Sequence, residues 1–278
     1  MTGVQTCALP ISEIDVLGNG LLIAPADATP GAVDGTDFGM AAIAGGSTSR
    51  TYTIRNPGTD PLTVSFVGVT GSGFSVTTQP TGTVPAFGAT TLVVTFAPSV
   101  AGSVTGTVSF TTNDADEGTF TFAISGLGLS PLESWRLTYF GSIANSGDGA
   151  DLADPDRDGS VNLAEYGLSL DPKVPTGGGG AMTRINNSGY LEIQFVRNIE
   201  RTDLTYTVQA SANLVTWTPI ASISGGGVAV VSGAHSLAET GAGTTRTVTV
   251  EDSQTTSSGS PRFLRIKLER TSASSVVM

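Results

Sequence analysis

Histidine and cysteine are almost missing from this sequence, which has one of each, His235 and Cys7, among 278 residues. The chain can therefore form no internal disulfide and no Cys/His zinc cluster, and it offers little material for histidine-dependent acid–base catalysis. Charged residues make up only 13%, and 24 acidic residues against 13 basic ones give a net charge of −11. A phosphate backbone or an anionic membrane surface would be repelled, which excludes nucleic acid as a partner.

Long apolar runs and catalytic signatures are also absent. No run approaches the roughly 18 residues that span a bilayer, so no membrane insertion is expected within this chain. There is no G-x-S-x-G nucleophile elbow, and His235, Ser236 and Glu239, which could suggest nucleophilic catalysis, lie in a Gly/Ala/Ser-rich segment. We therefore expect no enzyme, no catalytic residues and no organic cofactor.

The residues that are present are typical of a β-protein: 36 glycines, abundant Thr and Ser, and 39% hydrophobic residues. From Glu13 to Leu129, short alternating runs recur about every 10 residues, separated by turn dipeptides such as Asn19-Gly20. About seven or eight such strands fit a two-sheet sandwich of immunoglobulin size. The alternation places eight side chains in its core: Tyr52, Ile54, Leu62, Val64, Phe96, Phe110, Phe120 and Phe122.

The same region contains a series of segments in a family-typical order, namely Glu13–Gly20, Asp34–Gly39, Thr51–Leu62, Gly73–Val76, Val93–Pro98 and Thr112–Glu117. This series resembles the choice-of-anchor D repeat of bacterial surface proteins, which is related to the immunoglobulin-like domains of Hydin and abnormal-spindle proteins. The resemblance implies an immunoglobulin-like domain over residues 13–129. It implies little about function, because such sandwiches serve as spacers, adhesins and docking modules.

The first twelve residues are expected not to belong to the natural protein. Residues 4–12 match the translation of a widely used sequencing adapter, so we interpret residues 1–12 as a disordered assembly artefact of a metagenomic fragment. Cys7 then carries no biological role. A signal peptide or whole upstream domains are expected to have been lost.

One stretch carries recognisable site chemistry. Asp154–Glu165 fits the twelve-residue calcium loop D-x-D-x-D-G-x-x-N-x-x-E. In that pattern Ca²⁺ would be held by side-chain oxygens and one backbone carbonyl, from Asp154, Asp156, Asp158, Ser160 (carbonyl), Asn162 and Glu165.

Two alternatives stay open for the acidic segments. The loop is not preceded directly by a helix, so it resembles a dockerin half-loop or a thrombospondin type 3 repeat more than a complete EF-hand. The alternative to a calcium loop of any kind is an ordinary acidic turn. Asp148 or Asp151 could add ligands or form a second weak site. A further acidic turn, Asn113–Gly118, could bind a cation, but we expect it simply to join two strands of a hairpin.

The rest of the chain divides by composition. A connector is predicted over residues 130–175 and carries the calcium loop. It contains two predicted helices, at 132–140 and 163–170, and is followed by a Gly-rich linker at 176–181. Alternating runs predict a second, smaller β-sandwich over 182–270, with a frayed tail over 271–278. Trp217 is expected to be a core aromatic rather than a sugar-stacking platform.

The second half also carries a resemblance, on the segments Trp135–Gly141, Ala153–Asp156 and Phe263–Ile266. Together they resemble a C-terminal module of secreted proteins of verrucomicrobial type, for which no activity is implied.

The sequence thus predicts an all-β chain of two β-sandwich domains joined by a short helical connector with an EF-hand-like calcium loop. We expect a non-catalytic, monomeric fragment of a secreted or cell-surface bacterial protein that acts in spacing, adhesion or anchoring. Its partners would be Ca²⁺ and an extracellular glycan or protein. The alternative is a carbohydrate-binding accessory region of a larger secreted hydrolase, which a coplanar set of exposed aromatics would favour.

Overall fold

The computed structural model describes residues 11–177, 180–271 and 275–277. It forms two compact units, one ending at Ser130 and the other beginning at Pro131. Strands account for 46% and helices for 9% of the residues, so the expected β class is confirmed. Cys7 and most of the segment 1–12 lie outside the described residues. In the described part of the chain, no helix is both long enough and apolar enough to cross a membrane.

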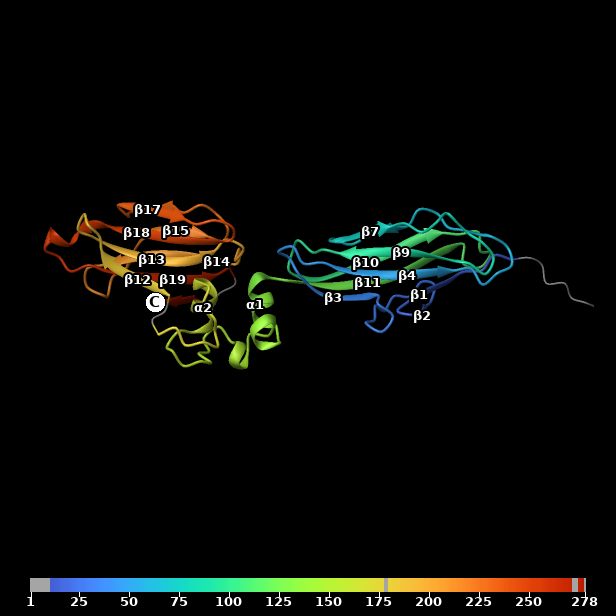
Figure 1. Cartoon of the computed structure of the whole chain (residues 1–278), viewed down its shortest axis with the longest axis horizontal. Helices are drawn as coiled ribbons and strands as arrows, with labels where there is room; N and C mark the ends of the chain where they lie inside the picture. The colour runs from blue at the N-terminus through green and yellow to red at the C-terminus, as the bar shows by residue number, and fades with distance from the viewer. Residues whose placement is uncertain (1–10, 178–179, 272–274, 278) are drawn as a thin grey trace, which may run out of the picture. The chain divides into compact units, whose positions relative to one another are not determined.

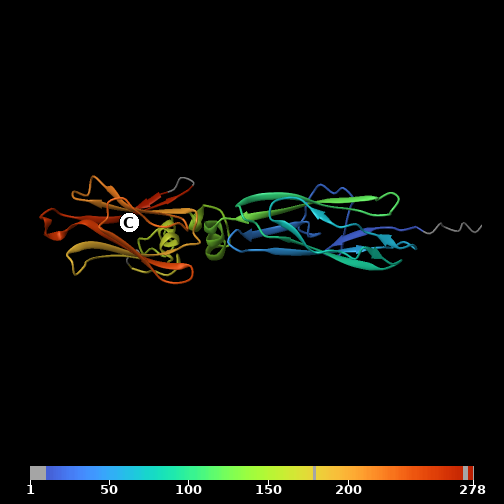
Figure 2. The ribbon, with the colours of Figure 1, turned by 90° about the horizontal axis from the view of Figure 1, so that it is seen from above.

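The first unit is built of two packed sheets, which Figures 1 and 2 show as two layers. The sheet orders are β2-β1-β4-β9-β7 and β3-β11-β10-β6, and β5 and β8 form a small ribbon. β3 runs parallel to β11, while the other pairs described in this unit are antiparallel. The strands are β1 (Asp15–Gly18), β2 (Leu21–Ile23), β3 (Asp37–Ala42), β4 (Thr48–Arg55), β5 (Leu62–Thr63), β6 (Gly68–Val69), β7 (Phe74–Thr78), β8 (Thr83–Val84), β9 (Ala89–Phe96), β10 (Gly102–Thr111) and β11 (Thr119–Leu129).

The core of this unit lies between the two sheets, as the alternation predicts. All eight side chains expected inside are buried, with at most 5% of their surface exposed. Tyr52 of one sheet lies edge-on to Phe122 of the other at 5.1 Å between ring centres. Within the second of these sheets, Phe110 stacks on Phe120 at 5.5 Å. The prediction of which strand faces point inward is therefore confirmed.

The second unit contains two helices and another pair of sheets (Figures 1 and 2). The sheet orders are β12-β13-β18-β17 and β16-β15-β14-β19-β20. The helices are α1 (Pro131–Phe140) and α2 (Asn162–Leu168), with single 3₁₀ turns at Gly147–Gly149 and Thr256–Ser258. The strands are β12 (Ala181–Ile185), β13 (Tyr190–Asn198), β14 (Leu204–Ser211), β15 (Thr218–Ser224), β16 (Val230–Val231), β17 (Ser236–Thr240), β18 (Thr245–Thr255), β19 (Phe263–Arg270) and β20 (Ser275–Val277).

The two helices belong to the core of this second sandwich. Trp135 of α1 and Tyr166 of α2 lie in one hydrophobic cluster with strand residues such as Phe195 and Tyr206. At Gly167 an added Cβ would lie 2.6 Å from Leu268 Cδ1, so α2 lies close against β19 and a larger residue would require the Leu268 side chain to shift. Residues 131–175 of the predicted connector thus belong to the same compact unit as the second sandwich. Such short helices cannot bury an apolar face alone, which explains why they pack onto the neighbouring sheets.

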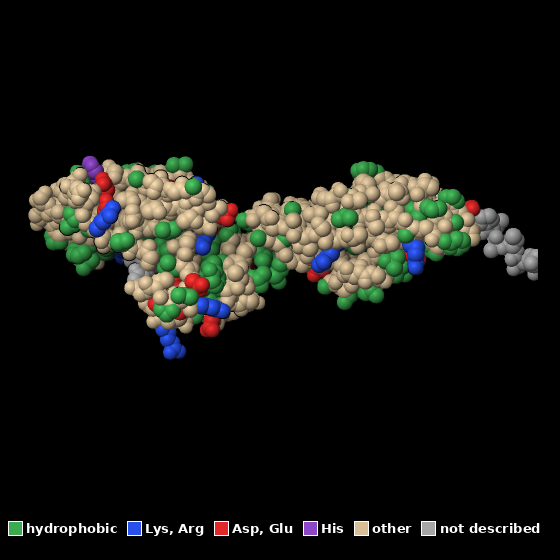
Figure 3. All heavy atoms as spheres, viewed as in Figure 1, with side chains coloured by type: hydrophobic (Ala, Val, Ile, Leu, Met, Phe, Trp, Pro, Cys, Tyr) green, Lys and Arg blue, Asp and Glu red, His purple; other side chains and the backbone are tan. Residues whose placement is uncertain are grey.

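The C-terminal residues and the surface complete the description. Residues 275–277, expected to lie in a frayed tail, form β20 and pair with β19 at the edge of a sheet. Figure 3 shows a visible surface made mostly of uncharged polar side chains and backbone, with charged groups scattered over it. This agrees with the low charged fraction of the sequence.

Candidate metal site

The predicted calcium loop is coiled by hydrogen bonds between its own residues. Asp156 Oδ1 accepts from the Asp158 N–H at 3.2 Å, Asp154 Oδ2 accepts from the Gly159 N–H at 3.0 Å, and Asp158 Oδ1 accepts from the Ser160 N–H at 2.7 Å. Gly159 has a φ of +92°, in the left-handed region that favours glycine. The chain therefore bends round, and carboxylate oxygens of Asp154, Asp156 and Asp158 all lie within 4.8 Å of one another.

Several oxygens of this loop are buried without a hydrogen-bond partner. Within the described part of the chain, these atoms are Asp154 Oδ1, Asp156 Oδ2, Asn162 Oδ1 and both Glu165 carboxylate oxygens. An unpartnered buried oxygen costs about 1–3 kcal/mol, and more when it is charged. An ordinary acidic turn would expose such oxygens to water, so their burial sets this loop apart from such a turn. Four of the six predicted ligand residues supply these atoms.

Glu165 is the most unusual member of the group. It lies in the first turn of α2 and is fully buried. Burial, followed by the nearby charges of Asp156, Asp158 and Asp154, raises the pKa of the Glu165 carboxyl to about 8. A carboxylate in this environment requires either a proton or a cation.

Asp158 and Asn162 do more than the loop pattern predicts. Asp158 Oδ2 accepts hydrogen bonds from the Thr176 N–H at 2.8 Å and from Thr176 Oγ1 at 2.9 Å, and these bonds help lower the pKa of Asp158 to about 2. Asn162 Nδ2 donates to the Asp148 carbonyl at 2.6 Å and to the Ala150 carbonyl at 2.7 Å. Thr176 opens the predicted flexible linker, and nothing in the spacing of the sequence signals this contact. Ser160 itself is buried.

Asp151, suggested as an extra ligand, has a different role. Its carboxylate is 4% exposed and pairs with Arg136, while Arg270 Nη1 lies 2.8 Å from its Oδ2. Arg136 is also buried and donates from Nε to the Gly149 carbonyl at 2.9 Å. Because two guanidinium groups already neutralise it, Asp151 does not suit a cation. Asp148 is exposed and contributes its backbone carbonyl to Asn162.

Asp203 links both helices to the sheet beside them. Its Oδ1 accepts from the Tyr166 hydroxyl at 2.6 Å, and its Oδ2 accepts from the Leu132 N–H at 3.1 Å. The Arg201 guanidinium lies over the Tyr166 ring at 4.5 Å. The hydrogen bond from Tyr166 to Asp203 thus attaches α2, the helix that begins within the calcium loop, to the residue just before β14.

The residues that could suggest catalysis bond to separate partners. The His235 ring stacks on Tyr190 at 4.1 Å. The Ser236 hydroxyl donates to Glu251 at 2.7 Å, and Glu239 accepts from Arg197 at 2.8 Å. Ser236 and Glu239 are therefore engaged elsewhere than with His235.

Trp217 lies at the surface, so the prediction that it is a core aromatic is wrong. It is half-buried, and the Arg265 guanidinium covers its ring at 4.0 Å. Trp217 directly precedes β15, so the inward alternation of that strand does not yet apply to it. The cation–π contact occupies one face of the ring.

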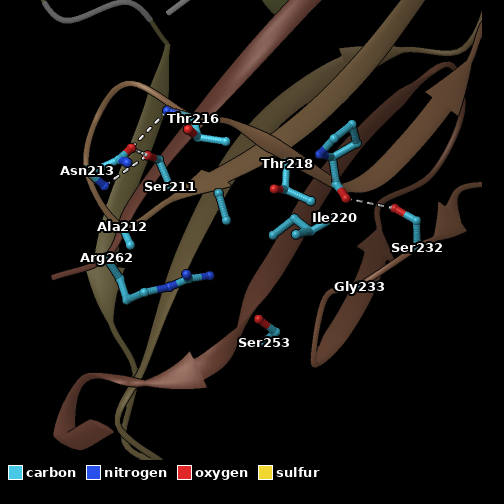
Figure 4. A pocket seen from close by; sticks show the side chains of 12 residues that line it. Ser211, Ala212, Asn213, Thr216, Thr218, Ile220, Ser232, Gly233, Ser253 and Arg262 are labelled. Carbon is cyan, nitrogen blue, oxygen red and sulfur yellow. Dashed lines mark hydrogen bonds between the residues drawn. The ribbon is translucent and has the colours of Figure 1, made fainter. Parts of the chain in front are cut away.

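A pocket of about 400 Å³ lies close to Trp217 in the chain, between the start of β15 and the segment around Ser232 (Figure 4). None of the twelve residues that line it is aromatic. Figure 4 shows small polar side chains around it, together with Arg262, whose guanidinium is bound to Asp252 at 2.5 Å. The lining lacks the aromatic platform that a sugar site would use.

These features define a class of protein: a modular β-sandwich protein whose first unit has an immunoglobulin-like fold. Residues 36–120 match the family model described as abnormal spindle-like microcephaly-associated, ASPM-SPD-2-Hydin (ASH). The match confirms the Hydin-like immunoglobulin-like domain that the sequence resemblance implies. It covers less than half of the chain, and the second unit lies outside it.

Comparison with solved structures gives distant likenesses. A protein of unknown function from Porphyromonas gingivalis W83 is 17% identical over 44% of this chain, with a TM-score of 0.33, and this chain spans half of its length. The ASH/PapD-like domain 7 of human CEP192 is 12% identical over 46% of this chain and 94% of its own, with a TM-score of 0.32. The secreted serine protease VesC from Vibrio cholerae is 11% identical over 84% of this chain and 49% of its own, with a TM-score of 0.29. Such scores carry no function over to this chain. A search of the curated proteins found no match.

Proposed function

We propose that this chain is a non-catalytic part of a secreted or cell-surface bacterial protein, acting as a spacer, adhesion or anchoring module that binds calcium structurally. The observation that carries the proposal is the set of five buried, unpartnered oxygens at predicted ligand positions in the described part of the Asp154–Glu165 loop. The immunoglobulin-like first unit supports the module role, because such sandwiches commonly present or space other domains. Calcium sites in extracellular modules typically have dissociation constants of ~10⁻⁴–10⁻³ M.

The residues of the loop have separable tasks in this proposal. Glu165 would give both oxygens to the ion, while Asp154, Asp156 and Asn162 would each give the oxygen that lacks a partner. Asp158 would add one lone pair and keep its bonds to Thr176. Because α2 is bonded to β14 through Tyr166 and Asp203, order in the loop would extend to the second sandwich.

The carbohydrate-binding alternative has less support. Among the described residues, the exposed aromatic side chains are Phe66 and Phe87, which lie in different loops of the first unit. Trp217 is half-buried beneath Arg265, and the pocket near it has no aromatic lining. A sugar platform of stacked rings would need a gathered set.

Calcium is expected to stabilise the second unit against heat. Binding to the folded state alone raises the unfolding free energy by RT ln(1 + [L]/Kd), about 2.7 kcal/mol at a hundredfold excess over Kd. Glu165→Gln should abolish this gain. It should also stabilise the calcium-free protein near neutral pH, because the buried Glu165 carboxyl must take up a proton on folding, whereas the amide is neutral in both states. Thermal unfolding followed by tryptophan fluorescence, in Ca²⁺, Mg²⁺ and chelator, measures both effects, since Trp135 and Trp217 both lie in this unit.

The matched control is Glu200→Gln, the same change at an exposed position of the same unit. It should leave the calcium-dependent shift intact. A wild-type protein whose melting temperature is the same in Ca²⁺ and in chelator would refute the calcium proposal, as would an equal calcium shift in Glu165→Gln.

A further inference from the structure

A second group of carboxylates gathers in the first unit, far along the chain from the loop. It consists of Glu13, Asp114, Asp116 and Glu117, whose oxygens all lie within 4.8 Å of one another. Glu13 precedes β1, and the other three lie in the turn that joins β10 to β11. The turn does join two hairpin strands, as expected from the sequence, but folding also brings Glu13 to it.

Asp114 is buried at the centre of this group, with 4% of its surface exposed. Its Oδ1 accepts from the backbone N–H groups of Asp116 and Glu117, at 3.3 and 3.4 Å. Its Oδ2 is buried and has no hydrogen-bond partner among the described residues. The turn uses only the first oxygen, and the second is left buried with its hydrogen-bonding capacity unused.

Basic side chains do not neutralise the group. Arg50 and Arg55 are the only basic residues that the sequence has before Ser130. Arg55 is paired with Asp15 at 2.6 Å, and Arg50 lies toward the other end of β4. Neither basic side chain of the described first unit therefore compensates the charge of the group.

The backbone around the group is held in place by hydrogen bonds. Asn113 Oδ1 accepts from the Thr63 N–H at 2.7 Å, and Asn113 Nδ2 donates to the Pro61 carbonyl at 3.1 Å. The Glu13 N–H donates to Asn56 Oδ1 at 3.3 Å. Both segments are thus positioned by the rest of the sandwich, which lowers the ordering cost of binding a ligand between them.

We propose that Glu13, Asp114, Asp116 and Glu117 form a second calcium site, which joins the segment before β1 to the β10–β11 turn. The donors are all carboxylate oxygens, the ligand type that hard divalent cations prefer. Asp116 is exposed, so water can complete the shell. Ca²⁺ tolerates such irregular geometry, whereas Mg²⁺ demands a near-ideal octahedron.

The test uses the full chain and separates this site from the loop. A loop variant, Asp154→Asn/Glu165→Gln, and a turn variant, Asp116→Asn/Glu117→Gln, are made singly and together. Calcium titrations are followed by the backbone amide NMR signals of residues 114–117. These signals should shift saturably in wild type and in the loop variant, with a dissociation constant of ~10⁻⁴–10⁻³ M, and should not do so in either protein that carries the turn changes.

Asp60→Asn is the matched control, because it removes one exposed carboxylate from the same unit outside the group. It should bind as wild type does. The proposal is overturned if the loop variant shows no saturable shift at residues 114–117 up to ~10 mM Ca²⁺, well above the expected dissociation constant. It is also overturned if the shift survives in the turn variant or if NaCl of equal ionic strength reproduces it. Loss of binding at the loop alone would refute the proposed function and leave this site standing.

Discussion

Replacing Asp151 by alanine is expected to lower the unfolding free energy of the second unit by about 3–5 kcal/mol, because it removes one partner of a buried ion pair. Arg136 is 2% exposed and would keep its charge with no carboxylate beside it. Arg270 would lose the same partner from β19. Urea unfolding followed by tryptophan fluorescence reports this change directly, since Trp135 lies next to Arg136 in α1.

Asp148→Ala provides the comparison, because Asp148 is an exposed carboxylate in the same segment. A surface change of this kind should alter stability by no more than about 0.5 kcal/mol. Equal effects of the two substitutions would show that the Asp151 pair does not hold α1 against the sandwich. A large effect of Asp151→Ala confined to calcium-containing buffer would instead make Asp151 a ligand.

Phe122→Ala is expected to destabilise the first unit by about 3–5 kcal/mol, the range for deleting a buried phenylalanine ring. Phe122 is 1% exposed and lies against Tyr52 and Phe120, at 5.1 and 6.5 Å between ring centres. Calorimetry of the whole chain should show that the first unit of the Phe122→Ala variant melts at a lower temperature than in the wild-type protein. The tryptophan-detected transition should stay in place, because both tryptophans lie in the second unit.

Phe66→Ala is the appropriate control, since Phe66 is 81% exposed in the same unit. It should leave both transitions within the error of measurement. If Phe122→Ala melted like wild type, the inward face assigned to β11 would be wrong, and with it the register of the sandwich.

Local patterns in the sequence predicted the features that depend on neighbouring residues. Period-2 alternation identified the core faces of the first unit, because one face of each strand must be buried. The spacing of the loop predicts a coiled segment, and carboxylate oxygens of Asp154, Asp156 and Asp158 do lie within 4.8 Å of one another. Both α-helices were found close to their observed bounds for the same reason.

Contacts between distant segments could not be predicted in this way. Asp151 and Arg270 are 119 residues apart, and Asp158 bonds to Thr176 across the whole of α2. Glu13 joins the β10–β11 turn only because β1 pairs with β4 in the folded sheet. These pairings depend on topology, on which composition and periodicity give no information. The expectation that Trp217 is a core aromatic rests on the low aromatic content of the chain, and composition does not determine on which side of a sheet a residue lies.

Four of the outermost strands in the described sheets are short. β2 and β20 have three residues each, and β6 and β16 have two, so each offers few open N–H and C=O groups along its rim. An edge of this length is a poor template for a strand from another molecule. Chains crowded together at high local density would therefore resist strand pairing at these four rims. The edges formed by strands of five or six residues (β3, β7, β12 and β17) remain longer.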